Sequence, residues 1–203
     1  MGIQREETEK EIINAAKNVF TKKGFKCSTM RDIASEANVN LAMLNYYFRS
    51  KENLFEIIFE EAFISLASNI IPVFSSNKNI FDKIYDFTEL YIEGLIQNPI
   101  IPGFVSHEIF INPDRFTKIL NDKKAIKGYV EAFEKQIEKE IQLGNIKSIE
   151  PMDLLINAIA LCVFPFIARP IAEDLLQPKE RYNDMLKARK KTVAQFIIDA
   201  IKK

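Results

Sequence analysis

The chain has 203 residues but no tryptophan, one histidine, two cysteines and six glycines. Cys27 and Cys162 cannot form the disulfide framework of a secreted domain of this size, so we expect reduced thiols and a cytoplasmic location. No histidine–cysteine cluster has the spacing of a zinc site, and a single histidine rules out a di-iron bundle site. The sequence therefore predicts neither a metal nor a cofactor.

Other absences narrow the class of protein. There is no glycine-rich phosphate loop and no nucleophile elbow, so we do not expect an enzyme. The first 20 residues lack the apolar core of a signal peptide, and the most apolar run, residues 154–168, is too short to span a bilayer. The 28 basic residues balance the 28 acidic ones. Any affinity for nucleic acid must therefore come from a local patch.

What the chain does have is the period of amphipathic helices along almost its whole length, with 16 phenylalanines for bulky apolar faces. Ser28 or Thr29 caps a short second helix. We predict an all-α fold of about nine helices with no strand. The helices are expected near residues 12–24, 29–37, 40–47, 51–71 (ended by Pro72), 80–96, 99–121 (short, then irregular), 123–143, 151–168 and from 179 to the end.

Residues 29–48 read "TMRDIASEANVNLAMLNYYF", which indicates a short helix, a tight turn and a second short helix. Ala34 is small where the two helices must cross closely. Val39 and Leu44 are apolar and fill the corner between the helices. This is the pattern of a helix-turn-helix, whose second helix enters a DNA major groove.

The outward side chains of the second helix are of types that contact DNA. Asparagine bonds to base edges, small apolar groups contact thymine methyls, and tyrosine hydroxyls reach phosphates. Between Lys22 and Lys51, six basic residues stand against two acidic ones, and this excess of four suits a few phosphate contacts. The outward set is Asn40, Leu41, Ala42, Met43, Asn45, Tyr46 and Tyr47. On periodicity alone a plain structural role stays open, because many helix pairs never touch DNA.

The run "TMRDIASEANVNLAMLNYYFRSKENLF" resembles the signature of the TetR family of bacterial regulators, and "KKGF" just upstream resembles the end of that family's first helix. The resemblance covers about residues 8–59. It implies a three-helix helix-turn-helix DNA-binding domain (residues 1–52) followed by a larger helical effector-binding and dimerisation domain (53–203). It assigns DNA contacts to Thr29, Asn40, Leu41, Ala42, Met43, Asn45, Tyr46, Tyr47 and Lys51.

The resemblance also implies a homodimer and a small-molecule effector. The last two long helices would form the dimer interface through Leu155, Tyr182, Leu186, Val193, Phe196 and Ile197. The apolar stripe of the last helix could equally be part of the core, and we favour the dimer. The effector pocket would lie among the middle helices, and its aromatic walls favour a hydrophobic ligand. Its candidate residues are Phe87, Tyr91, Phe104, His107, Phe110, Tyr129, Phe133 and Phe164. Ordinary core packing is the alternative for each of these phenylalanines.

The function we predict is a DNA-binding transcriptional regulator, a repressor released from a near-palindromic operator by its effector. Leu41, Ala42 and Met43 offer few hydrogen bonds to bases, so DNA shape would contribute to specificity. The same weakness keeps an alternative open, a helical ligand-binding or partner-binding protein that has lost DNA binding. The sequence does not separate repression from activation.

Overall fold

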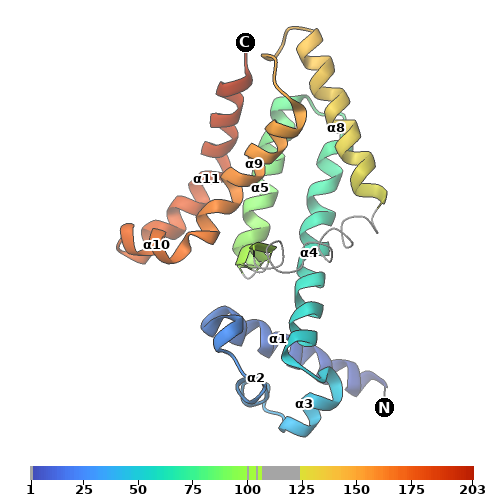
Figure 1. Ribbon diagram of the computed structural model, residues 1–203, viewed down its shortest axis with the longest axis vertical. Helices are drawn as coiled ribbons and strands as arrows, with labels where there is room; N and C mark the ends of the chain where they lie inside the picture. Colours follow the sequence, from blue (N-terminus) through green and yellow to red (C-terminus); the bar gives the residue numbers. More distant parts are fainter. Residues whose placement is uncertain (1, 100, 104, 107–123) are drawn as a thin grey trace. The chain divides into compact units, whose positions relative to one another are not determined.

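The computed structural model describes residues 2–99, 101–103, 105–106 and 124–203. Over these residues the protein is helical and contains no strand; one isolated antiparallel bridge joins Ile146 and Lys202. The chain divides into two compact units, an N-terminal unit (Met1–Ile64) and a C-terminal unit (Ser65–Lys203). Figure 1 shows the helices of each unit. The all-α fold expected from helical periodicity is confirmed.

Four helices build the N-terminal unit: α1 (Gly2–Cys27), α2 (Met30–Glu36), α3 (Leu41–Phe48) and the first part of α4 (Lys51–Ser75). Helical geometry in α1 is interrupted at Gly24, where φ is 75° and ψ is 160°. Glycine adopts this positive φ at little cost because it has no Cβ. The predicted stop at Gly24 is therefore a break in the helical geometry, and α1 as a whole ends at Cys27.

The core of the N-terminal unit collects the apolar stripe of each helix. Such stripes recur every three or four residues, which places them on one helix face. Ala34 is only 5% exposed, which agrees with the expected need for a small side chain where two helices cross closely. The buried side chains include Ile12, Ala16, Val19, Phe20, Ile33, Leu44, Phe48, Leu54 and Ile58.

The C-terminal unit holds the end of α4 together with α5 (Ile80–Gln97), α8 (Lys124–Gln142), α9 (Pro151–Ile167), α10 (Arg169–Leu175) and α11 (Lys179–Ile201). Helix α11 packs against α5 and α9, and α8 packs against both α5 and α9. Buried apolar side chains fill this unit, among them Ile84, Phe87, Ile92, Leu95, Phe133, Ile137, Leu154, Cys162, Tyr182, Val193 and Ile197.

Two prolines behave differently from the sequence expectation. Pro72 does not end α4, which continues to Ser75. A proline removes the main-chain bond to the carbonyl four residues earlier and crowds that carbonyl, but the residues after it keep their own N–H groups, so three more residues of α4 follow Pro72. The segment after Pro165 is also not a simple break, because the separate helix α10 begins at Arg169 with Pro170 in its first turn. Helices α9 and α10 are bent by 69°.

A buried lysine closes the end of α4. Lys83 of α5 is only 5% exposed, and its Nζ donates to the Phe74 carbonyl oxygen at 2.8 Å and to Gln136 Oε1 at 2.6 Å. The carbonyls at a helix C-terminus carry partial negative charge and attract a cation. Burial lowers the pKa of Lys83. Lys83 therefore ties the last turn of α4 to α5 and α8.

Helix α4 is long and apolar enough to cross a membrane by length and composition, and so is the bent pair α9–α10. Core helices of soluble proteins pass the same test. About a third of the α4 window is buried inside the protein.

Candidate nucleic-acid interface

Helix α2 begins with a closed capping box. The Thr29 hydroxyl oxygen accepts a bond from the Asp32 main-chain N–H at 3.1 Å, and Asp32 Oδ2 accepts one from the Thr29 N–H at 2.9 Å. Lys23 reaches the same carboxylate at 2.7 Å. The bonds from Lys23 and Thr29 lower the pKa of Asp32 to about 2. The start of α2 is thereby fixed in place, as Thr29 capping predicts.

The turn between α2 and α3 depends on Asn38, whose φ is 53°. Asparagine accepts this left-handed conformation more readily than most side chains. The Asn38 N–H donates to the Ser35 carbonyl at 3.2 Å, and the Val39 N–H donates to the Ala34 carbonyl at 3.0 Å. These bonds hold the tight turn that the sequence "NVN" predicts.

Helix α3 presents one buried and one exposed face. Asn40 caps it, with its side-chain oxygen accepting from the Met43 N–H at 2.8 Å. Leu44 and Phe48 are buried in the unit. The outer face carries Ala42, Met43, Asn45 and Tyr46 in exposed positions, with Leu41 and Tyr47 half-buried beside them.

The Tyr46 side chain is 70% exposed and meets the Tyr47 ring edge-on, with 5.5 Å between ring centroids. An exposed aromatic side chain that bears a hydroxyl offers both contact area and a polar group. Tyr47 in turn lies 6.2 Å from the buried Phe48 ring. The two tyrosines thus continue the buried core outward to the surface.

Lys51, at the first position of α4, is engaged within the N-terminal unit. Its Nζ donates to the main-chain carbonyls of Phe25 at 2.9 Å and of Ser28 at 3.0 Å. The same ammonium lies 4.3 Å from the centroid of the Phe25 ring. No local pattern of residues signals these contacts, because they depend on where the chain runs after Gly24.

Some basic residues of this region form ion pairs and others do not. Lys23 pairs with Asp32, and Lys22 pairs with Glu36 at 3.3 Å. Both acids counted between Lys22 and Lys51 are therefore neutralised locally. Within the described part of the chain, no ion pair is recorded for three exposed basic residues that the site prediction did not include: Lys26, Arg31 and Arg49.

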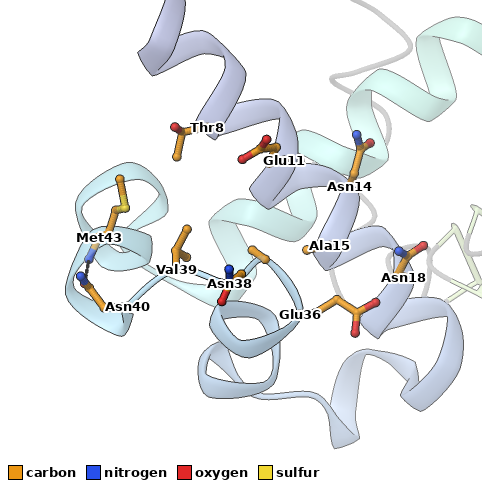
Figure 2. Close-up of a pocket in the computed structure, with 11 residues that line it drawn as sticks. Thr8, Glu11, Asn14, Ala15, Asn18, Glu36, Asn38, Val39, Asn40 and Met43 are labelled. Atoms are coloured by element: carbon orange, nitrogen blue, oxygen red, sulfur yellow. Dashed lines mark hydrogen bonds between the residues drawn. The ribbon is translucent and has the colours of Figure 1, made fainter.

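A groove of about 730 Å³ lies between α1 and the α2–α3 turn, as Figure 2 shows. Its lining is polar, with the amides of Asn14, Asn18 and Asn38 and the carboxylates of Glu11 and Glu36. Carboxylates repel phosphate, so this groove does not suit the DNA backbone. The outer face of α3 is the better surface for a duplex.

These features define the N-terminal unit as a helix-turn-helix domain: a capped first helix, a tight turn and a second helix with an exposed outer face. Residues 12–58 match the family model described as "Bacterial regulatory proteins, tetR family". The N-terminal unit therefore matches the DNA-binding domain of TetR-family regulators in sequence and in its helix-turn-helix.

Named relatives are regulators as well. The chain is 29% identical over 141 residues to IcaR, the negative transcriptional regulator of the biofilm operon icaADBC in Staphylococcus aureus (strain Newman), covering 65% of this chain and 75% of that protein. It is 25% identical over 154 residues to the uncharacterized HTH-type transcriptional regulator YfiR of Bacillus subtilis, covering 73% and 72%. HlyIIR, a hemolysin II transcriptional regulator, shares the fold, with a TM-score of 0.61, 23% identity and coverage of 98% and 99%.

The predicted effector residues fall into three groups. Phe87 and Tyr91 are neighbours on α5, with 5.3 Å between ring centroids, and Tyr129 and Phe133 lie on α8. The prediction missed Phe74. The centroid of its ring lies 5.8 Å from that of Phe87 and 5.4 Å from that of Phe133. Phe164 is 66% exposed on α9. Phe104, His107 and Phe110 lie outside the described residues.

The predicted dimer residues are also split. Tyr182, Leu186, Val193 and Ile197 are buried in the core of their own chain, because this face of α11 covers α5 and α9. These four are at most 5% exposed, so they offer little area to a second copy in this structure, and their assignment to the dimer surface stays a prediction. Phe196 is 65% exposed and Leu155 is half-buried. Apolar side chains exposed on the adjoining α9 are Met152, Ile156, Phe164 and Ile167.

Proposed function

We propose that this regulator is a repressor that binds a near-palindromic operator as a homodimer and is released by a small hydrophobic effector. The observation that carries the proposal is the exposed outer face of α3, held by a capped helix and a tight turn. The similarity to IcaR, a negative regulator by its name, favours repression over activation.

In the proposed complex each α3 enters a major groove, and the two half-sites lie about one helical turn or somewhat more apart. Ala42 and Met43 face base edges and thymine methyls, and Asn45 bonds to a base edge. Thr29, Asn40, Leu41 and Tyr46 adjoin this contact. Tyr47 contacts phosphate, and Lys51 supplies its remaining N–H to phosphate. The exposed Lys26, Arg31 and Arg49 add sequence-independent attraction.

The dimer would form through the exposed apolar faces of α9 and α11. Ile156, Phe164 and Phe196 are each more than half exposed, and exposed apolar patches mark interaction sites. A two-fold dimer uses the same patch on both copies. Phe196 and Leu155 are therefore the members of the predicted dimer set that we retain.

The effector would enter the aromatic cluster of the C-terminal unit. Phe74, Phe87 and Phe133 surround an apolar cavity of only about 20 Å³, whereas ligand pockets usually measure about 300–1,000 Å³. A ligand must therefore separate these rings, with Tyr91 and Tyr129 nearby to bound the widened space. The predicted Phe164 is exposed and fits the dimer surface better than a pocket.

Ring separation gives the effector a physical route to the DNA-binding domain. Phe74 lies in the last turn of α4, whose first residue is Lys51. A displaced Phe74 shifts the end of α4 and thereby changes the separation of the two recognition helices. A coupling of about 1–3 kcal/mol would weaken operator binding by roughly 5–150-fold.

The test is a selection of genomic fragments with the purified protein, followed by titrations at two salt concentrations. We expect one near-palindromic site, bound by two chains, with affinity that falls steeply as salt rises. An Asn45→Ala variant should select an altered site. Selection of no site at low salt would reject the repressor and leave the alternative, a ligand-binding or partner-binding protein without DNA affinity.

A further inference from the structure

We propose that Lys51 is a positioning residue that clasps the first turn of α4 to the junction between α1 and α2. This clasp makes the helix-turn-helix and the start of α4 one rigid body. The proposal rests on the DNA-binding function above only for its operator readouts. Its stability and exchange readouts require no DNA.

The clasp has three components around one ammonium group. Lys51 Nζ donates to the carbonyls of Phe25 and Ser28, at 2.9 and 3.0 Å, and lies 4.3 Å from the Phe25 ring centroid. An ammonium has three N–H donors, so two of them are already used. A cation over an aromatic face adds electrostatic attraction. Lys51 is therefore held by contacts that a freely solvated phosphate-binding lysine would not have.

The carbonyls are available because the chain changes direction between α1 and α2. Gly24 interrupts α1, and α2 starts only at Met30. The Phe25 carbonyl also accepts the Ser28 hydroxyl at 2.8 Å, and Ser28 is only 2% exposed. The Lys51 head therefore completes a part-buried polar junction.

Aromatic packing reinforces the same contact. Phe55 follows Lys51 by four residues, so both lie on one face of α4. The Phe55 ring is 4.6 Å from the Phe25 ring and 5.0 Å from the Phe20 ring. Lys51 and Phe55, one turn apart on α4, thus both contact the end of α1.

The position of the clasp gives it a functional consequence. Ser28 directly precedes Thr29, which caps α2. A movement of the first turn of α4 is therefore passed through Lys51 to the residue next to the start of the helix-turn-helix. Without the clasp, the start of α2 would keep its own cap but lose one of the contacts that fix its position relative to α4.

The test compares Lys51→Met with Lys51→Arg, and uses Lys10→Met as the control. Lys10 is an exposed lysine of the same unit, so its replacement removes the same charge without touching the junction. The readouts are thermal unfolding, hydrogen exchange at residues 26–30, the salt dependence of operator binding, and discrimination between operators whose half-sites are one base pair closer or farther apart.

We expect Lys51→Met to lower the unfolding temperature by about 2–4 °C and to speed exchange at residues 26–30. Its discrimination between operator spacings should fall roughly tenfold. Lys51→Arg should recover part of each loss, because a guanidinium also donates to two carbonyls. If Lys51→Met proves too unstable to purify, Lys51→Arg is compared with the native protein. Faster exchange at residues 26–30 in Lys51→Arg supports the clasp, and exchange at the native rate overturns it.

The proposal is overturned if Lys51→Met unfolds and exchanges like Lys10→Met while only the salt dependence of binding changes. One lost phosphate contact per chain lowers the slope by about 0.9, or roughly two for a dimer. That result would make Lys51 a phosphate contact alone. A protein that binds no operator at all would reject the proposed function, yet leave the stability and exchange tests of the clasp intact.

Discussion

Arg189 of α11 donates a hydrogen bond from Nη2 to the main-chain carbonyl of Leu161 in α9, at 2.6 Å. In an uninterrupted helix this carbonyl would accept the N–H of the residue four positions later. That residue is Pro165, which has no N–H. Arg189 therefore replaces the bond that Pro165 removes. Tyr182 of the same helix adds a bond to the Pro165 carbonyl at 3.2 Å.

This relationship predicts a dependence between Arg189 and Pro165. Arg189→Leu should destabilise the protein by about 1–3 kcal/mol, because it leaves a half-buried carbonyl without a donor. In a Pro165→Ala background the helix recovers its own donor, and the same replacement should be clearly milder. Urea unfolding of the two single variants and the double variant measures this coupling.

The cycle also separates two effects of the Arg189 side chain. Its Nε is buried and has no hydrogen-bond partner in the described part of the chain, so removing it recovers some stability in both backgrounds. Because this gain is the same in the native and Pro165→Ala backgrounds, it cancels when the two effects of Arg189→Leu are subtracted. Equal losses in both backgrounds would show that Arg189 does not act through the Leu161 carbonyl.

The carboxyl group of Asp32 should have a pKa well below that of an ordinary aspartate. The bonds from Lys23 and Thr29 favour its ionised form and lower its pKa from 3.8 to about 2. A pKa that is lower in the folded state means that ionised Asp32 favours folding above about pH 4, and that this contribution disappears as the pH falls toward 2. Acid should therefore loosen the start of α2.

The carboxyl resonance of Asp32, followed by NMR during an acid titration, tests this prediction. We expect a midpoint near pH 2 in the native protein and a higher one in Lys23→Met, because Lys23 is the largest cause of the shift. Lys22→Met is the matched control, since Lys22 pairs with Glu36 instead. An equal rise in both variants would point to general charge rather than the Lys23 bond.

The helix-turn-helix was predictable because its determinants are local. Thr29 and Asn40 cap helices that start at the next residue, and Asn38 supplies the turn between them. Each of these needs only a few neighbouring residues. The contacts of Lys51 join residues 23 and 26 positions apart, and no local pattern signals them.

The two surfaces of α11 show a second limit of sequence patterns. Phe196 and Ile197 are adjacent and similarly apolar, yet Phe196 is 65% exposed and Ile197 is 4% exposed. Periodicity places each on a helix face but does not say which face meets α5. Phe74 was missed for a related reason, because its contacts with Phe87 and Phe133 depend on how α4, α5 and α8 converge.

The two cysteines should differ sharply in reactivity. Cys27 is exposed, whereas Cys162 is fully buried and burial raises its pKa to about 12. The thiolate is the reactive form, so a buried thiol with a raised pKa is nearly inert. In the native protein at pH 8 we expect one thiol per chain to react with a colorimetric disulfide reagent, and two after denaturation. If a folded Cys27→Ser variant still showed one reactive thiol per chain, this assignment would be wrong.

The adjacent pair on α11 offers a direct test of the proposed dimer. Phe196→Glu places a charge on an exposed face, so the fold should survive while dimerisation weakens by about tenfold or more, as expected when an interface aromatic is lost. Ile197→Ala instead creates a cavity in the core and should cost about 2–5 kcal/mol of stability. Sedimentation equilibrium reports the first effect and urea unfolding the second.

If Phe196→Glu left self-association intact while Met152→Glu and Ile156→Glu on α9 abolished it, the interface would lie on α9 alone, and α11 would serve only the core. If none of the three changed it, the dimer would have to form on a different surface.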